Sequence, residues 1–153
     1  SVIRPGILEP LKTRAMYMFQ LDPRLQADSE AIGDLPLSQV RLVNNADFPW
    51  VLLIPRQNNL REIHQLSPSD QRQFIAESSH LSKAMAAAFN ADKMNVAALG
   101  NMVAQLHLHV IVRWAGDICW PGPIWGQHQA APMSADQQAE RQQIIAHIIH
   151  DWR

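Results

Sequence analysis

The stretch AQLHLHVIVRW, residues 104–114, decides the fold, because polar and aliphatic residues alternate in it before a purely apolar run. A period of two is typical of a β-strand, since successive side chains point to opposite faces of a sheet. We therefore predict a strand over residues 104–112, with one polar face and one aliphatic face. The polar face carries Gln105, His107 and His109. The opposite face carries Leu106, Leu108 and Val110 and should point into a hydrophobic layer.

Length and composition favour an ordinary globular domain. The chain has 153 residues, of which 47% are hydrophobic and 18% charged, and this composition argues against disorder. The net charge is −1 and the basic residues are scattered, so no basic stripe exists for an extended nucleic acid. No apolar run approaches the roughly 20 residues of a membrane helix. The single Cys119 excludes an intramolecular disulfide, and we expect a cytoplasmic protein.

The N-terminal half predicts three strands. Residues 15–21 form the first, and the Pro- and Gly-containing stretch 22–36 after it is typical of turns. The alternating residues 39–43 form the second. The continuous apolar run 50–55 indicates a central strand that is buried on both faces.

The second half predicts two helices around two further strands. Ser67 and Pro68 are a typical N-cap and first helical residue, and the helix should reach about Phe89, with Asn90 as its C-cap. A strand over 93–100 and a bend at residues 100–101 follow it. Residues 117–127 are irregular. Ser134 should cap a last helix with an apolar stripe made of Ile144, Ile145, Ile148, Ile149 and Trp152. This order indicates an α+β fold with a mainly antiparallel, five-stranded sheet and two main helices.

Two imidazoles on one strand face admit three interpretations. They could decorate a solvated sheet surface. They could bind a metal, but that needs a third ligand, and His64, His80 and His128 could reach them only through folding, while His147 and His150 should be solvated. They could also be catalytic, because neutral imidazole, with an ordinary pKa of ~6.5, is a good nucleophile towards phosphorus.

The segment QLHLHVI, residues 105–111, resembles the histidine-triad (HIT) motif, His-φ-His-φ-His-φ-φ with φ apolar, with Gln105 at the first histidine position. Three further segments are similar to the same family in the same order: residues 41–56 (RLVNNADFPWVLLIPR), 92–101 (DKMNVAALGN) and 120–126 (WPGPIWG). The resemblance covers roughly residues 15–126 and is closest to the bacterial diadenosine-polyphosphate-hydrolase-like branch.

The resemblance implies a HIT-like, nucleotide-binding domain over residues 15–126. On either side of it we expect an N-terminal arm at 1–14, and a C-terminal linker and helix at 127–153 that pack on the same domain. The resemblance also implies a two-fold homodimer whose sheets join. His107 would be the nucleophile on the α-phosphorus, and His109 would contact phosphoryl oxygens together with Gln105. The implied nucleotide-binding residues are Asn44, Asn95, Gly100 and Asn101.

Three positions depart from the family pattern. Gln105 stands for the first triad histidine, while Trp50 and Asn58 stand where many members have additional histidines. A glutamine can donate a hydrogen bond but cannot act as a general acid, so phosphoanhydrides should be preferred over phosphoramidates unless His109 or a water supplies the proton. Alternatively, Gln105 merely packs beside the loop. Trp50 would ordinarily be core or interface.

The leading hypothesis is therefore a nucleotide hydrolase or nucleotidyl transferase that cleaves an α-phosphate bond, as in a dinucleoside polyphosphate, through a nucleotidyl-His107 intermediate. The alternatives are a nucleotide-binding module with little turnover, a nucleoside phosphoramidase and a metal-dependent hydrolase. No cofactor is required, although Mg²⁺ can accompany a polyphosphate. The expected partners are a nucleotide and a second copy of the chain, with no extended nucleic acid and no membrane. Trp120 and Trp125 either stack on a base or pack structurally.

Overall fold

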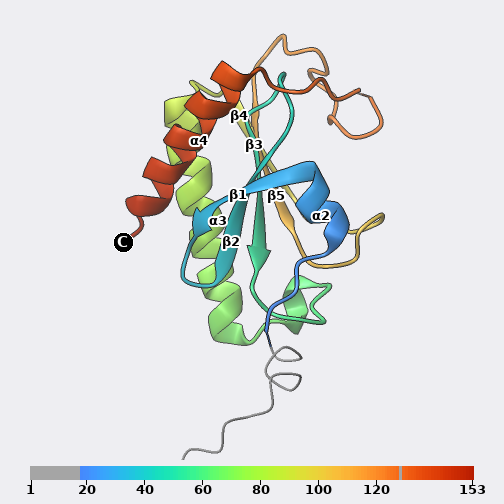
Figure 1. Ribbon diagram of the computed structural model, residues 1–153, viewed down its shortest axis with the longest axis vertical. Helices are drawn as coiled ribbons and strands as arrows, with labels where there is room; N and C mark the ends of the chain where they lie inside the picture. The colour runs from blue at the N-terminus through green and yellow to red at the C-terminus, as the bar shows by residue number, and fades with distance from the viewer. Residues whose placement is uncertain (1–17, 128) are drawn as a thin grey trace, which may run out of the picture.

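The computed structural model describes residues 18–127 and 129–153, which form one antiparallel sheet with two long helices on one face (Figure 1). The sheet order is β1-β2-β3-β5-β4, and every neighbouring pair is antiparallel. The predicted α+β class with a five-stranded sheet is confirmed. The elements are α2 (Pro23–Asp28), β1 (Ser29–Asp34), β2 (Ser38–Val43), β3 (Trp50–Pro55), η1 (Ile63–Gln65), α3 (Pro68–Ala88), β4 (Lys93–Ala97), β5 (Leu108–Arg113) and α4 (Ala135–His150).

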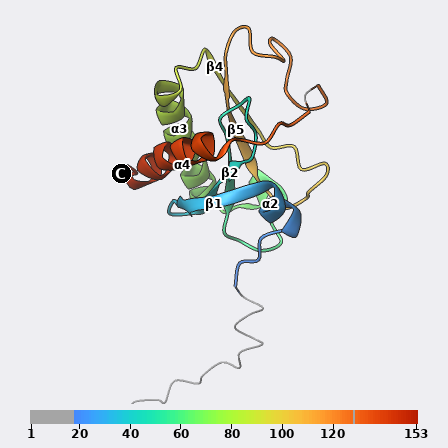
Figure 2. The ribbon, with the colours of Figure 1, turned by 45° about the horizontal axis from the view of Figure 1, so that its top comes forward.

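The two faces of the sheet have different partners. Figures 1 and 2 show α3 and α4 side by side on one face and α2 on the other side of the sheet. The main core lies under α3 and α4, where Val51 and Leu53 of β3 pack with Phe74 and Leu81 of α3. Trp50, Leu52 and Ile54, which alternate with these residues along β3, point to the opposite face. The run 50–55 is therefore apolar throughout because both of its faces are covered, as predicted.

The helix signals in the second half of the chain are confirmed. The Ser67 hydroxyl accepts the Asp70 N–H at the start of α3, and the Ser134 hydroxyl accepts the Gln137 N–H at the start of α4. The C-cap of α3 is Phe89, however, and Asn90 follows it with φ of 52°. No helix among residues 18–127 and 129–153 is long and apolar enough to cross a membrane.

The prediction for the region before β2 is wrong in part. Residues 15–17 of the expected first strand, like the expected N-terminal arm at 1–14, lie outside the described residues, and residues 18–21 form no strand. The stretch 22–36 was expected to be turns, but it contains α2 and β1. The Asp22 carboxylate caps α2 by accepting the Arg24 N–H, and Pro23 begins the helix. Pro23 is thus a helix start and Gly33 lies at a strand bulge, whereas Pro36 lies in the bend between β1 and β2.

Two strands near the predicted site are shorter than expected. The strand predicted over 93–100 ends at Ala97, and the strand predicted over 104–112 begins only at Leu108. Residues 98–107 instead form a loop, with Gly100 at its bend in the left-handed region at φ of 71°. Because the alternation of faces belongs to strands, it no longer governs where the Gln105 side chain points.

Candidate functional site

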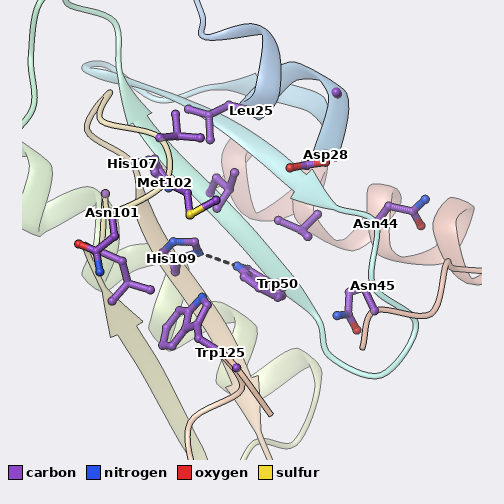
Figure 3. A pocket seen from close by; sticks show the side chains of 18 residues that line it. Leu25, Asp28, Asn44, Asn45, Trp50, Asn101, Met102, His107, His109 and Trp125 are labelled. Atoms are coloured by element: carbon purple, nitrogen blue, oxygen red, sulfur yellow. Dashed lines mark hydrogen bonds between the residues drawn. The ribbon is translucent and has the colours of Figure 1, made fainter. Parts of the chain in front are cut away.

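A cavity of about 860 Å³ opens on the face of the sheet opposite α3, between α2, the loop at 99–103 and the loop that carries Trp125 (Figure 3). Its volume is that of a typical site for a small ligand. Most of the lining is apolar, including Leu25, Leu52 and Val103. Its polar side chains are Asp28, Asn44, Asn45, Asn101, His107 and His109. None of the described lining residues is Lys or Arg, so the described part of the chain lines this space without a basic side chain.

His107 lies in the cavity immediately before β5 and is 7% exposed. Its Nδ1 lies 2.7 Å from the backbone oxygen of Gln105. A carbonyl oxygen only accepts hydrogen bonds, so Nδ1 carries the proton and donates it. The neutral ring then has its lone pair on Nε2. The local backbone therefore fixes the tautomer of His107.

His109 lies on β5 next to His107, with 4.9 Å between the ring centroids. The Trp50 indole donates from Nε1 to Nδ1 of His109 over 3.1 Å, drawn as a dashed line in Figure 3. Burial, and then the charge of His107, lowers the pKa of His109 from its ordinary 6.5 to about 4. His109 is therefore neutral near pH 7, and its proton is on Nε2.

The two tryptophans of the irregular segment occupy different places. Trp125 lines the cavity and contacts the rings of His109 and Trp50 edge to face, at centroid distances of 5.1 and 6.3 Å. Trp120 instead covers the Arg113 guanidinium at 5.7 Å from the ring centroid. Trp125 is thus placed to contact a ligand, and Trp120 packs structurally.

The loop between β2 and β3 brings Asn44 and Asn45 to the cavity. The buried Arg141 of α4 donates to the backbone oxygens of Asn45, Ala46 and Phe48 and fixes the path of this loop. The side-chain oxygen of Asn45 accepts two backbone N–H groups within the loop, and that of Asn44 accepts the N–H of residue 133. These bonds orient both amides at the rim.

The candidates from the second half of the sheet separate in the structure. Gly100 and Asn101 line the cavity, whereas Asn95 does not, because its side-chain oxygen accepts a hydrogen bond from Arg113. Arg113 also pairs with Asp117, and this hydrogen-bonded pairing lowers the pKa of Asp117 to about 2. Asn95 therefore belongs to the polar network beneath Trp120 rather than to the cavity.

Gln105 does not share the cavity with the two histidines. Its side-chain oxygen accepts the Asp22 N–H at 2.8 Å, and its Nε2 donates to the Gln20 oxygen at 2.9 Å. Asn58 forms two similar hydrogen bonds to the same segment: its side-chain oxygen accepts the Gln20 N–H, and its side-chain nitrogen donates to the Met18 oxygen. We name these four bonds the amide clamp, made by Gln105 and Asn58 on residues 18–22. The expectation that Gln105 projects with His107 and His109 is corrected, because Gln105 lies in the loop before β5 and its side chain bonds to Asp22 and Gln20 instead.

None of the other histidines in the described part of the chain offers this pair a third ligand. His80 bonds through Nε2 to the Ile148 oxygen at 2.7 Å, and its ring packs on Trp152. His147 and His150 are exposed, as predicted, beside Asp151. Within residues 18–127 and 129–153 no group of three or more His, Cys, Asp and Glu side chains could hold a metal ion.

Trp50 is the site residue that sequence reasoning assigned to core or interface. Its position opposite Ile111 in the β3–β5 register places it diagonally across from His109 on the same face. The sequence signal for this role was an aromatic residue with a hydrogen-bond donor at the start of the central strand β3. Asp28 was missed because its segment was expected to be a turn.

The HIT domain family model matches residues 24–116, and the chain belongs to this family. Among solved structures, a histidine triad protein from Marinobacter aquaeolei VT8 is 46% identical, with a TM-score of 0.86 over 89% of this chain and 99% of that one. Histidine triad proteins from Bradyrhizobium japonicum and Sinorhizobium meliloti 1021 are each 40% identical. Their TM-scores are 0.84 and 0.82, over 86% and 84% of this chain and 98% and 96% of theirs. No curated protein matches the chain significantly.

Proposed function

We propose that the protein is a nucleotide hydrolase or nucleotidyl transferase in which His107 attacks the α-phosphorus of a nucleoside phosphate. Membership of the HIT family supports a nucleotide substrate. The observation that carries the proposal is the bond between Nδ1 of His107 and the Gln105 oxygen, which leaves the Nε2 lone pair facing the cavity. A nucleoside has room in the apolar part of the same space, with Trp125 and Leu25 as stacking and packing partners.

The reaction proceeds in two displacements. The Nε2 lone pair of His107 forms a bond to phosphorus while the bond from phosphorus to the leaving oxygen breaks, and that oxygen keeps the electron pair. The Gln105 carbonyl stabilises the positive charge that the ring gains. Water then bonds to phosphorus, the N–P bond breaks and its electrons return to Nε2, while the water proton passes to solvent. The Nε2–H of His109 donates to a phosphoryl oxygen.

The leaving group we propose is a phosphate chain, as in a dinucleoside polyphosphate. A phosphate with a second pKa of about 6 departs without a proton from the enzyme, whereas an amine does not. Gln105 lies outside the cavity and the pKa of His109 is about 4, so neither supplies a proton at neutral pH. Since no lysine or arginine is among the described lining residues, Mg²⁺ would accompany such a substrate and balance its charge.

Because neither Gln105 nor His109 supplies a proton to the leaving group, a second candidate is a nucleotide-binding module with little turnover. Its cavity would hold a nucleoside monophosphate against His107 and His109 without forming a covalent bond. A phosphoramidase is disfavoured by the proton that an amine leaving group requires.

We also propose a homodimer formed through β4. This strand is an edge of the sheet, and the hydrophobic side chains of Val96 and Leu99 are 45% and 44% exposed on and just after it. An unpaired strand edge with exposed apolar side chains is suited to pairing with a second copy.

The test is quenching with alkaline denaturant during turnover of diadenosine tetraphosphate, because the N–P bond of a nucleotidyl-histidine breaks in acid, followed by intact-mass measurement. The expected result is an added AMP on the wild-type protein and none on His107→Asn. Tight AMP binding without adduct or product would replace the enzyme by the binding module. Faster cleavage of an adenosine phosphoramidate than of diadenosine tetraphosphate would overturn the proposed leaving group.

A further inference from the structure

The two histidines of the cavity are held by partners of opposite hydrogen-bond character. Nδ1 of His107 faces a carbonyl oxygen, which only accepts, and Nδ1 of His109 faces the indole N–H of Trp50, which only donates. A neutral imidazole has one donor and one acceptor nitrogen. The two rings are therefore opposite tautomers. Nε2 of His107 has a lone pair towards the cavity, whereas Nε2 of His109 carries a hydrogen.

We propose that Trp50 is a positioning residue that fixes His109 as an Nε2–H hydrogen-bond donor and so prevents it from acting as a general acid. The consequence for catalysis deepens the proposed function, on which it rests. The tautomer itself is a property of the folded protein and needs no substrate.

The geometry makes an imidazolium at His109 unfavourable. A second ring proton would have to sit on Nδ1, where it would point at the Trp50 N–H only 3.1 Å away between the nitrogens. Trp125 covers the ring edge to face, and His109 is 8% exposed. The titratable side chains among the described lining residues are His107, 4.9 Å away between ring centroids on the same segment, and Asp28 of α2. Because the Trp50 N–H occupies Nδ1, the other ring nitrogen of His109 already carries its hydrogen and offers no lone pair to a proton in the cavity.

This arrangement selects a substrate class. With His109 as a constant donor, negative charge on a phosphoryl oxygen is stabilised, but the leaving group receives no proton. The site is then suited to nucleotides whose leaving group is itself acidic, such as phosphates and phenols of low pKa. The rate of adduct formation should fall steeply as the pKa of the leaving group rises.

The tautomers can be read directly from ¹⁵N-labelled protein by long-range ¹H–¹⁵N correlation of the imidazole rings. We expect His109 to show protonated Nε2 and bare Nδ1 from pH 8 to about pH 5, and His107 to show the reverse at pH 8. A scalar coupling across the hydrogen bond between the Trp50 indole nitrogen and Nδ1 of His109 should be visible in the wild type. This NMR measurement therefore needs no variant. Nδ1–H at His109, or its titration near pH 6.5, would overturn the proposal.

Trp50→Phe keeps an aromatic ring but removes the donor. In this variant we expect His109 to titrate at least one pH unit higher and to populate both tautomers. Trp114→Phe is the matched control, because that indole donates to the Phe89 and Asn90 oxygens outside the cavity, and it should leave the His109 signals unchanged. Identical His109 signals in Trp50→Phe and wild type would contradict the proposal.

The catalytic arm uses aryl esters of AMP whose phenols span pKa values of about 5 to 10. In the wild type the rate of adduct formation should fall steeply across the series, and in Trp50→Phe the ratio between best and worst ester should narrow at least about tenfold, because His109 then transfers a proton. An unchanged ratio overturns the proposal. If no ester forms an adduct with the wild type, the proposed function fails, while the NMR result still decides the role of Trp50.

Discussion

Two neighbouring regions of the molecule use polar side chains in opposite ways. In the cavity, His107 and His109 each have one ring nitrogen held by the protein and the other facing the open space. In the amide clamp, Gln105 and Asn58 use both ends of their side chains on backbone groups of residues 18–22. In the cavity one ring nitrogen of each histidine stays available to a ligand, whereas in the amide clamp both ends of each side chain are bonded within the protein.

The amide clamp still affects the cavity, because it holds the segment that leads into α2. Arg24 adds to this by donating to the Met102 oxygen of the opposite loop while pairing with Asp22. Leu25 and Asp28 of α2 line the cavity. The comparison teaches that two residues separated by one position in the chain can differ in role: the His107 side chain faces the cavity, and the Gln105 side chain supports one wall of it.

The largest effect is expected from His107→Asn. Removing the nucleophile should abolish the AMP adduct and lower the rate of hydrolysis about a thousandfold or more. Gln105→Ala should lower that rate less than tenfold, since Gln105 does not face the cavity. Steady-state hydrolysis of diadenosine tetraphosphate by both variants checks this difference. Equal losses in the two would mean that Gln105 takes part in the chemistry.

The second effect concerns stability against acid. His109 has a pKa of about 4 in the folded protein and an ordinary value of 6.5, so the unfolded state binds a proton first as the pH falls. The free energy of unfolding should therefore drop between pH 6.5 and 4, by a total on the order of 3 kcal/mol. The neutral clamp residues contribute no such dependence.

Denaturant titrations at a series of pH values measure this slope, with His109→Gln as the comparison. The variant should lose the dependence between pH 6.5 and 4. It should keep the loss at lower pH that comes from Asp117, whose pKa is held at about 2 by Arg113 and whose contribution disappears as the pH falls from 3.8 towards 2. The same slope above pH 4 in His109→Gln would show that another group causes it.

The third effect is local. Gln105→Ala removes one hydrogen bond to the Asp22 N–H and one to the Gln20 oxygen and should lower the free energy of unfolding by about 1–3 kcal/mol. Amide hydrogen exchange should accelerate at Asp22, while that of Val110 in β5 changes only with global stability. Unchanged exchange at Asp22 would mean that the amide clamp does not order this segment.

The sequence predicted the cavity better than the clamp, for physical reasons. The helix caps at Ser67 and Ser134 and the buried run of β3 are local signals, so they could be recognised without tertiary structure. The pair His107 and His109 was found because they are close in sequence, and the structure places both in the cavity.

The clamp could not be found in this way. Gln105 is joined to Asp22 across 83 positions of sequence, and no local pattern contains that contact. Its position was predicted from strand alternation, but β5 begins only at Leu108, so the alternation does not extend back to Gln105. Trp50 and His109 are likewise 59 positions apart, and only the β3–β5 register brings the indole to the ring. Similarly, α2 was missed because Asp22 and Pro23 serve equally as turn and helix-start residues.

The smallest effect is expected from Asn58→Ala, whose bonds to the backbone are more exposed than those of Gln105 at Asp22. The loss should be below about 1 kcal/mol, with faster exchange at Gln20 but not at Asp22. Because Asn58 binds the N–H of Gln20 and Gln105 binds its oxygen, the two substitutions should be coupled. In a double-mutant cycle the combined loss should differ from the sum by about 0.5 kcal/mol or more. Strict additivity would show that the two amides hold the segment independently and that the amide clamp is not one unit.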